Sequence, residues 1–360
     1  MGRELEALGA SVSLLDGNHV CAELAGREPH LLLIGHTDTV WPVGTLASMP
    51  FRVDGDRAYG PGIYDMKSCL VVLLEAIRRA GDERRALRVF LTADEEMGSP
   101  TGVVLLEAIR RAGDERRALR VFLTADEEMG SPTGRALLEA AAEGVAAALV
   151  VEPSTQNGNL KTARKGLGRF RLTVTGRPAH AGTHRAEGVS AIEELAHQVL
   201  ALHALNDDER GVSVNVGVVR GGTSENVVAA EAEAQIDVRI ARAEDRGRIE
   251  GVLAALEPVT AGAKLELSGG WTRPPLERSA GGAKLFEQAR RHGRELGLEL
   301  QEASSGGGSD GNIVGALGVP VLDGLGAEGG GAHASDEHVL LDSLPIRAEL
   351  LARLLRSPGV

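Results

Sequence analysis

Five polar clusters in this chain contain a histidine or a carboxylate and could take part in metal chemistry. They are GHTDTV (35–40), YGPGIYDMK (59–67), LTADEEMGS (91–99, repeated at 123–131), VVEPS (150–154) and GAHASDEHV (331–339). Each cluster alone has an ordinary explanation, such as a solvated acidic loop or an aspartate that caps a helix. Together they offer imidazole and carboxylate groups without cysteine, a combination that suits zinc or a similar divalent ion.

The spacing inside two of the clusters strengthens this interpretation. His36 and Asp38 are two residues apart, so on an extended segment their side chains project to the same side. That is the arrangement of a metal-binding histidine with a carboxylate that orients it. The three adjacent acids of each LTADEEMGS copy, Asp94–Glu96 and Asp126–Glu128, repel one another unless a cation or a shared proton compensates their charge.

Alternating apolar strands and amphipathic helices would position these clusters. Short apolar runs typical of buried strands occur at His30–Gly35, Val121–Ala125, Ala146–Val151 and Val319–Leu325. Helical patterns separate or follow them, at Met66–Ala80, Arg135–Glu143 and Leu344–Leu355. This alternation predicts an α/β sheet with helices on its faces. Ligands of such sheets bind at the carboxyl ends of the strands, which is where the polar clusters stand.

The middle of the chain has a different pattern. Apolar and polar residues alternate in Phe170–Thr175, Val212–Val219 and Glu231–Ile240, and helical patterns occupy Val189–Leu205 and Glu244–Leu256. Strict alternation is typical of antiparallel strands with one face in water. The sequence therefore predicts a small α+β domain inserted into the first one.

An internal repeat leaves one part of the site ambiguous. Residues 71–102 and 103–134 are identical, and two identical copies do not make a solenoid. The unit contains one predicted helix (Val71–Ala80 in the first copy), one strand (Leu87–Ala93) and the acidic cluster. Because a fold that needs this unit once can place only one copy, either Glu-Glu pair could enter the site.

The composition excludes several functional classes. The 360 residues carry a net charge of −12 and only 2% aromatic residues, which argues against a nucleic-acid partner. No run of 18 apolar residues exists, so we expect no membrane span. The two cysteines cannot form a disulfide framework, and we expect a cytoplasmic location.

With these motifs in order along the chain, the sequence resembles the two-zinc aminoacylase/carboxypeptidase family of metallopeptidases. The likeness is greatest to glutamate carboxypeptidases of the carboxypeptidase G type. It extends to TGRPAHAG (175–182), SENVVAAEAEAQIDVR (224–239) and SSGGGSDGN (304–312). The chain departs from the family pattern in the duplicated block and at Ser68–Cys69, where the family usually has two glycines.

The resemblance implies a fold with two domains. The catalytic di-zinc domain would comprise residues 1–164 and 276–360, including the duplication, with a mixed, mainly parallel sheet and helices on both faces. Residues 165–275 would form an α+β lid with an antiparallel sheet, through which the family dimerises. The resemblance also implies a cis peptide bond between Asp65 and Met66.

The resemblance further implies two zinc ions per chain. His36, Asp65 and Glu152 would hold one ion. Asp65 would also bridge to a second ion, held in addition by Glu128 and His333.

Catalytic roles follow from the same resemblance. Asp38 would orient His36, and Glu127 would be the general base. The first copy of the repeat offers Glu95 as the alternative base and Glu96 as the alternative ligand. The uninterrupted run from the second copy to the VVEPS cluster favours the second copy.

The lid would supply the substrate-binding groups. His180 would donate a hydrogen bond to the developing oxyanion from the partner subunit. Asn226 and Arg239 would bind the carboxylate of the substrate, although Arg239 could equally form an ordinary salt bridge. We therefore expect a homodimer that takes a small peptide or an N-acyl amino acid.

The predicted function is hydrolysis of an amide or peptide bond next to a free carboxylate, releasing a C-terminal glutamate or a similar amino acid. One alternative is an N-acyl-amino-acid deacylase of the acetylornithine deacetylase or succinyl-diaminopimelate desuccinylase type. An alternative of another class is an inactive binding or assembly protein on the same fold.

Overall fold

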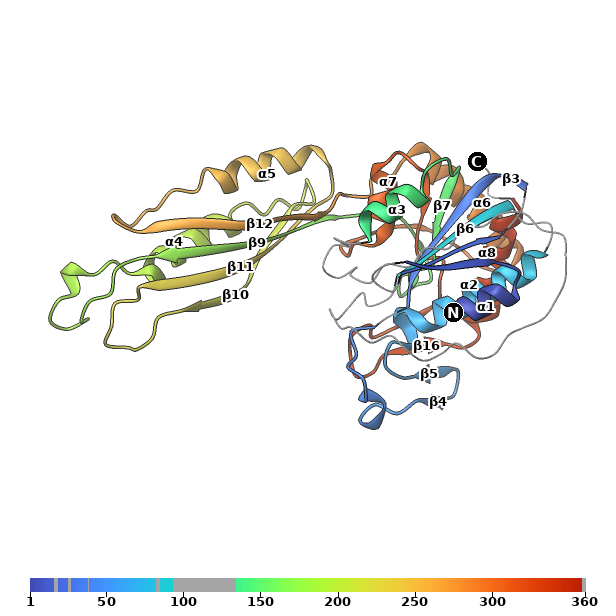
Figure 1. Cartoon of the computed structure of the whole chain (residues 1–360), viewed down its shortest axis with the longest axis horizontal. Helices are drawn as coiled ribbons and strands as arrows, with labels where there is room; N and C mark the ends of the chain where they lie inside the picture. The colour runs from blue at the N-terminus through green and yellow to red at the C-terminus, as the bar shows by residue number, and fades with distance from the viewer. Residues whose placement is uncertain (16–18, 25–26, 38, 82–84, 93–133, 358–360) are drawn as a thin grey trace. The chain divides into compact units, whose positions relative to one another are not determined.

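A computed structural model of the chain describes residues 1–15, 19–24, 27–37, 39–81, 85–92 and 134–357. These residues form two compact units, both drawn in Figure 1. The discontinuous unit comprises Met1–Arg164 and Leu276–Val360, and the inserted unit comprises Lys165–Pro275. Among the described residues, none of the helices combines the length and the apolar character that a membrane span requires.

The discontinuous unit is built on a six-stranded sheet with the order β1-β2-β6-β3-β7-β14. Its strands are β1 (Ser11–Leu15), β2 (His19–Leu24), β6 (Arg85–Thr92), β3 (Arg27–His36), β7 (Ala147–Val150) and β14 (Val321–Leu322). The central pairs β6–β3, β3–β7 and β7–β14 are parallel, whereas β1–β2 and β2–β6 are antiparallel. The sheet is therefore mixed and mainly parallel around β3.

Strand β3 lies at the centre because its residues are apolar on both faces. Leu31 and Leu33 belong to a core cluster that includes residues of helices α2 (Ser68–Ala80), α6 (Ala280–Glu295) and α8 (Ser343–Arg356). Leu32 and Ile34 belong to a second cluster, with helices α3 (Arg135–Ala141) and α7 (Asp310–Ala316). Figure 1 shows helices on both faces of this sheet. Burying each of these side chains contributes about 1.5–3 kcal/mol, which keeps the strand in the middle of the sheet.

Smaller elements complete this unit. They are α1 (Gly2–Ala7), the 3-10 turn η1 (Thr45–Ala47), the kinked turn η2 (Ile63–Lys67), the parallel pair β8 (Leu160–Arg164) and β13 (Glu302–Ser305), and a four-stranded sheet of β15 (Gly329–Gly330), β16 (His338–Leu340), β5 (Arg57–Tyr59) and β4 (Arg52–Asp54). The kinked turn and the loop between β15 and β16 belong to two of the polar clusters. The four-stranded sheet was not predicted from the sequence.

The inserted unit has an antiparallel sheet with the order β10-β11-β9-β12. The strands are β9 (Gly166–Thr175), β10 (Ser213–Gly221), β11 (Glu231–Ile240) and β12 (Lys264–Arg273). Helices α4 (Ala191–His203) and α5 (Glu244–Ala254) share one core cluster with the buried side chains of this sheet, and a short 3-10 turn, η5 (Arg185–Glu187), precedes α4. Alternate residues of β11 are buried, which agrees with the alternation in the sequence.

The predicted fold class, an α/β unit with an inserted antiparallel α+β unit, is confirmed. The first copy of the repeat contributes most of α2 and the whole of β6. The second copy, with the predicted strand Val121–Ala125, lies outside the described residues. The strand predicted at Val319–Leu325 is shorter than expected, since β14 contains only Val321–Leu322.

A buried carboxylate makes the stability of the inserted unit depend on pH. Glu194 of α4 is fully buried, and it accepts hydrogen bonds from Gln198 Nε2 (2.6 Å), Thr260 N (2.6 Å) and Val259 N (3.2 Å). Burial acts to raise the pKa of Glu194, but these hydrogen bonds outweigh it and the pKa lies below its ordinary value. The ionised form therefore stabilises the fold above the ordinary glutamate pKa, and this stability is lost as the pH falls through the lowered value.

We predict that Glu194→Gln lowers the free energy of unfolding at pH 7 by about 1.5–3 kcal/mol, because a charged acceptor of backbone N–H groups is lost. The difference from wild type should shrink as the pH falls below about 4.3, where an ordinary glutamate begins to take up a proton. Thermal unfolding of both proteins between acidic and neutral pH measures this. A difference that stays constant over the whole range would contradict the assigned role of the charge.

Candidate metal centre

The parallel register of β3 and β7 brings His36 and Glu152 to the same edge of the sheet. Ile34 of β3 is aligned with Val150 of β7, and Val151 N donates to Ile34 O at 2.8 Å. Two residues beyond this aligned pair stand His36, the last residue of β3, and Glu152. The imidazole Nε2 of His36 lies 3.6 Å from Oε1 of Glu152.

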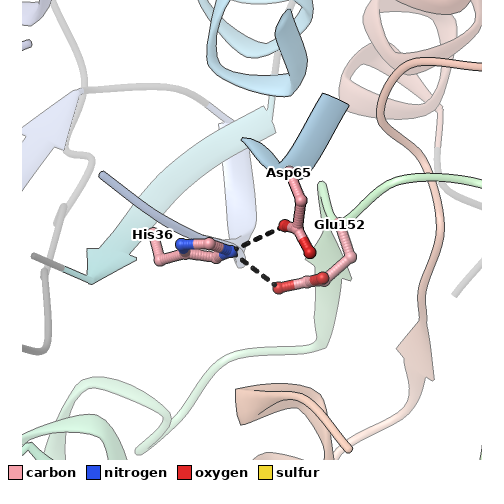
Figure 2. A group of neighbouring side chains, drawn as sticks. All are labelled: His36, Asp65 and Glu152. Atoms are coloured by element: carbon pink, nitrogen blue, oxygen red, sulfur yellow. Dashed lines mark hydrogen bonds and ion pairs between the residues drawn. The ribbon is translucent and has the colours of Figure 1, made fainter. Parts of the chain in front are cut away.

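Asp65 reaches the same point from the kinked turn η2. Its Oδ1 lies 3.0 Å from His36 Nε2. Figure 2 shows the carboxylates of Asp65 and Glu152 directed toward the same nitrogen of this imidazole. The peptide bond Asp65–Met66 is cis, which confirms the expectation from the resemblance. The backbone N–H of His36 donates to Met66 Sδ at 3.0 Å, so the cis dipeptide also contacts the end of β3.

A glycine is required just before this turn. Gly62 has a φ of +65°, and a Cβ at this position would collide with the side chain of Thr39. A side chain here would therefore displace either the turn that carries Asp65 or the loop that follows His36.

The three side chains are largely shielded from solvent. His36 has a side-chain exposure of 2%, Glu152 of 13% and Asp65 of 18%. Burial, followed by the negative charge of Asp65, raises the pKa of Glu152 to about 8. Burial alone would also raise the pKa of Asp65, but its contacts with the imidazoles of His333 and His36 outweigh this and lower it well below the ordinary value. The negative charge of Asp65 thus opposes the ionisation of Glu152 unless a cation joins the two carboxylates.

The geometry fits a small divalent ion. Donor atoms bound at about 2.1 Å in a tetrahedral site are about 3.4 Å apart. The observed distances from His36 Nε2, 3.0 and 3.6 Å, bracket that value, and the three ligand atoms all lie within 4.8 Å of one another. Within the described parts of the chain, this is the only group of three or more metal-ligating side chains gathered so closely.

A second imidazole lies beside Asp65. His333 Nε2 is 3.7 Å from Asp65 Oδ2, whereas His36 contacts the other carboxylate oxygen. His333 has a φ of +64°, the only positive φ among the described residues other than glycine. A left-handed backbone at such a side chain is common at functional sites. The structure therefore brings together the four predicted ligands that lie within the described residues.

A buried ion pair supports Glu152 from another side. Arg164 donates to both carboxylate oxygens of Asp323 at 2.7 Å, and both side chains are almost fully buried. Arg164 Nη2 also lies 4.0 Å from Glu152 Oε2, the oxygen that does not contact His36. The guanidinium therefore places a positive charge next to this carboxylate. Neither Arg164 nor Asp323 stands out in the sequence, because nothing there shows that they meet.

The remaining predicted site residues fall into two groups. Asp38 and both acidic pairs, Glu95–Glu96 and Glu127–Glu128, lie outside the described residues. His180, Asn226 and Arg239 belong to the inserted unit.

The comparisons with known proteins agree with this geometry. Residues 32–104 match the peptidase family M20/M25/M40, and residues 162–256 match a peptidase dimerisation domain. Carboxypeptidase G2 from Pseudomonas sp. (strain RS-16) is 31% identical over 99% of this chain and 82% of its own length. The chain belongs to the M20 peptidase family. M20 proteins are metal-dependent peptidases and amidohydrolases, so this chain is an M20 hydrolase.

Further proteins are similar over most of the chain. Succinyl-diaminopimelate desuccinylase from Thioalkalivibrio sulfidiphilus is 28% identical over 91% of this chain and 83% of its own length. The structure of aminopeptidase PepT from Bacillus cereus aligns with a TM-score of 0.76 at 20% identity, covering 99% of this chain and 91% of that one. The YXEP protein of Bacillus subtilis, a dinuclear metal-binding peptidase from the M20 family, aligns with a TM-score of 0.62 at 17% identity, covering 98% and 89% of the two chains.

Proposed function

We propose that this M20 protein is a zinc-dependent hydrolase that cleaves an amide or peptide bond next to a free carboxylate and releases a C-terminal glutamate or a similar amino acid. The observation that carries the proposal is the convergence of His36, Asp65 and Glu152 at one edge of the sheet. Similarity to carboxypeptidase G2 along the whole chain supports the choice of leaving amino acid.

In this proposal His36, Asp65 and Glu152 would hold one zinc ion, and Asp65 and His333 would contribute to holding a second. The two oxygens of Asp65 face different imidazoles, which suits a bridging carboxylate. When bound, such a pair of ions lowers the pKa of a shared water and polarises the scissile carbonyl. The discontinuous unit would then be the catalytic domain, and the inserted unit the lid.

The duplicated block would supply the remaining acids. One glutamate of a pair would complete the second site, and the other would take a proton from the attacking water and return it to the leaving amine. Thr92, the last residue of β6, is aligned with His36, and Glu95 and Glu96 follow within four residues. This alignment supports the first copy, whereas the uninterrupted run to the VVEPS cluster favours Glu127 and Glu128, and both pairs remain open to test.

In the inserted unit, the hydrogen bonds of His180 leave its Nε2–H as a hydrogen-bond donor. Its Nδ1 accepts hydrogen bonds from Gly182 N (3.1 Å) and Thr183 N (3.2 Å), so in the neutral imidazole the proton is on Nε2. Its side chain is exposed. Such a donor could stabilise an oxyanion, which is the role we propose for it.

Asn226 is next to His180 in the inserted unit, and Arg239 is not. Ala181 N donates to Asn226 O at 2.9 Å, and His180 is bridged to Val227. Both lie beyond the end of the sheet where β11 begins and β9 ends. Arg239 lies at the other end of β11, where it forms an ion pair with Asp237.

The sheet separates Arg239 from His180 by too great a distance for one small substrate. His180 lies near the Glu231 end of β11, and Arg239 is near the other end. The strand between Glu231 and Arg239 is about 26 Å long, at about 3.3 Å per residue. If both side chains act on the same substrate, they must therefore come from different subunits. This supports the proposed homodimer in which His180 serves the partner's site.

An apolar patch on the inserted unit could form the dimer contact. Among the described strands, β10 is at the edge of its sheet, and α4 packs beside it. The α4–β10 patch includes Ile192 (48% exposed), Leu200 (72%) and Val219 (55%), which line one shallow hollow. Exposed apolar side chains gathered next to a strand edge are typical of a surface that pairs with a second copy.

Two alternatives remain. Similarity to succinyl-diaminopimelate desuccinylase favours the N-acyl-amino-acid deacylase, in which the same metal centre acts on a different acyl group. An inactive binding protein would keep the fold without the ions. We also propose the expected cytoplasmic location, which agrees with the finding that neither Cys21 nor Cys69 is in a disulfide bond.

We predict that the purified chain binds about two zinc ions and hydrolyses N-acyl-glutamates with higher kcat/KM than N-succinyl-diaminopimelate or N-acetylornithine. Removal of the metal by a chelator should abolish activity, and zinc should restore it. Glu152→Gln should lose one ion, because a neutral amide cannot compensate the cation. Metal analysis and an assay of released amino acid check this.

The duplicated acids provide an internal control for that experiment. Glu95→Gln removes the candidate general base of the first copy, and Glu127→Gln removes that of the second. Only the variant whose substituted copy occupies the site should lose activity. A metal-free wild-type chain would favour the inactive protein, and higher kcat/KM for an N-succinyl or N-acetyl substrate would favour the deacylase.

We predict that Leu200→Glu converts the dimer into a monomer with greatly reduced activity, since a charge is placed in the α4–β10 patch. Leu317→Glu, at a site in the discontinuous unit that is 50% exposed, is the control and should remain dimeric and active. Light scattering and the same assay measure both properties. A Leu200→Glu protein that stays dimeric would show that the contact lies elsewhere.

Mixing of two inactive variants tests the role of His180 in the partner's site. His180→Ala and His36→Ala chains, unfolded and refolded together, should recover about a quarter of wild-type activity, because half of the random dimers contain one intact site. Absence of recovery although mixed dimers form would contradict the exchange of His180 between subunits.

A further inference from the structure

The loop between β15 and β16 contains a buried carboxylate that the proposed mechanism does not use. Glu337 is fully buried, four residues after His333 in the chain. It does not lie within the cluster of metal-ligating atoms formed by His36, Asp65 and Glu152. Its carboxylate oxygens are occupied by N–H donors instead.

Both oxygens of Glu337 accept two hydrogen bonds each. Oε1 accepts from the backbone N–H groups of Tyr64 (2.9 Å) and Asp65 (3.1 Å). Oε2 accepts from the backbone N–H of Gly62 (2.8 Å) and from the indole Nε1 of Trp41 (2.7 Å). Three of the four donors therefore belong to the backbone that leads into the candidate ligand Asp65.

These contacts join three of the segments that carry candidate ligands, those of His36, Asp65 and His333. Trp41 follows His36 in the loop after β3, the three backbone donors belong to the turn that carries Asp65, and Glu337 itself is part of the loop that carries His333. The same loop is anchored where it enters β16, since the first residue of that strand is paired with the last residue of β5. A single carboxylate thus fixes the relative positions of segments that are far apart in the sequence.

The hydrogen bond from the Asp65 N–H has a direct consequence for the proposed bridging carboxylate. Asp65 has φ −111° and ψ 97°, and both it and Met66 lie outside the helical range. The hydrogen bond to Glu337 holds its backbone in this conformation, and the backbone sets the direction of its side chain. Groups that hold ligands in this way commonly affect metal affinity without contacting the metal.

We propose that Glu337 is a positioning residue that holds Asp65 and the loop of His333 in register for two metal ions. The inference rests on the proposed function, because it assumes that Asp65 and His333 are ligands. The carboxylate acts through geometry. It offers two oxygens to two pairs of donors, and neither an amide nor a shorter carboxylate can reproduce this.

The test compares Glu337→Gln, Glu337→Asp and wild type. The amide keeps the size but presents an NH₂ group to one pair of N–H donors. The aspartate keeps the charge but is one methylene shorter, so it cannot reach all four donors. Glu194→Gln is the matched control, since it also removes the charge of a fully buried glutamate that binds backbone N–H groups, far from the ligands in sequence and in the other unit.

The full-length proteins are freed of metal and titrated with Co²⁺ and Zn²⁺ against a chromophoric chelator, and the thermal unfolding of the metal-free forms is recorded. We expect both Glu337 variants to bind the ions about ten- to a hundredfold more weakly than wild type and to show an altered Co²⁺ absorption spectrum. At saturating metal, kcat should fall more than KM rises. Glu194→Gln should be less stable than wild type but keep its metal affinity and spectrum.

The outcomes separate this inference from the proposed function. If wild type binds the ions and Glu337→Gln binds them with equal affinity and an unchanged spectrum, Glu337 has only a structural role and the inference is wrong. If Glu337→Asp keeps wild-type metal affinity, the negative charge alone is sufficient. The proposed positioning role of Glu337 is then also refuted. If wild type binds no divalent ion, the proposed function itself fails, and this inference fails with it.

Discussion

The site depends on the electrostatic repulsion between two largely shielded carboxylates, Asp65 and Glu152, that meet at one imidazole. Asp65 and Glu152 are both largely shielded from water, and together with burial the charge of Asp65 raises the pKa of Glu152 to about 8. Without a cation the two carboxylates would not both be ionised. Bringing them together would then contribute no stability to the fold. A divalent cation between the two carboxylates would attract both of them, which explains why the fold brings them together.

The rest of the discontinuous unit can be understood as the means of holding these acids in place. The aligned ends of β3 and β7 place His36 and Glu152, and the apolar residues on both faces of β3 fix that register. Asp65 has no strand to hold it. Its position depends on the left-handed conformation of Gly62 and on hydrogen bonds from this turn to Glu337.

Much of this could be predicted from the sequence. The apolar run of β3 and the alternation in β11 follow directly from side-chain burial, and the register of parallel strands then places polar residues at their ends. The candidate ligands His36, Asp65, Glu152 and His333 were found because their motifs are distinctive. Their meeting was expected because the polar clusters follow strands of one α/β sheet, whose ligands bind at the carboxyl ends of the strands. The strand order itself was not predicted.

Other parts could not be predicted. The contact between Glu337 and Trp41 joins residues 296 positions apart, and in the sequence Glu337 looks like one more acid in a polar loop. Arg164 and Asp323 form their buried pair only because β8 lies beside the segment that follows β14. The identical repeat is a different case, because the sequence contains two equal candidates for one place and no local pattern can distinguish them.

The most direct test of the central claim is a crystal structure of the zinc-loaded protein, with anomalous scattering recorded at the zinc edge. We expect a strong anomalous peak about 2.0–2.2 Å from His36 Nε2 and from carboxylate oxygens of Asp65 and Glu152, with a second peak between Asp65 and His333. Zinc bound elsewhere, with these side chains in contact only with each other or with water, would contradict the claim.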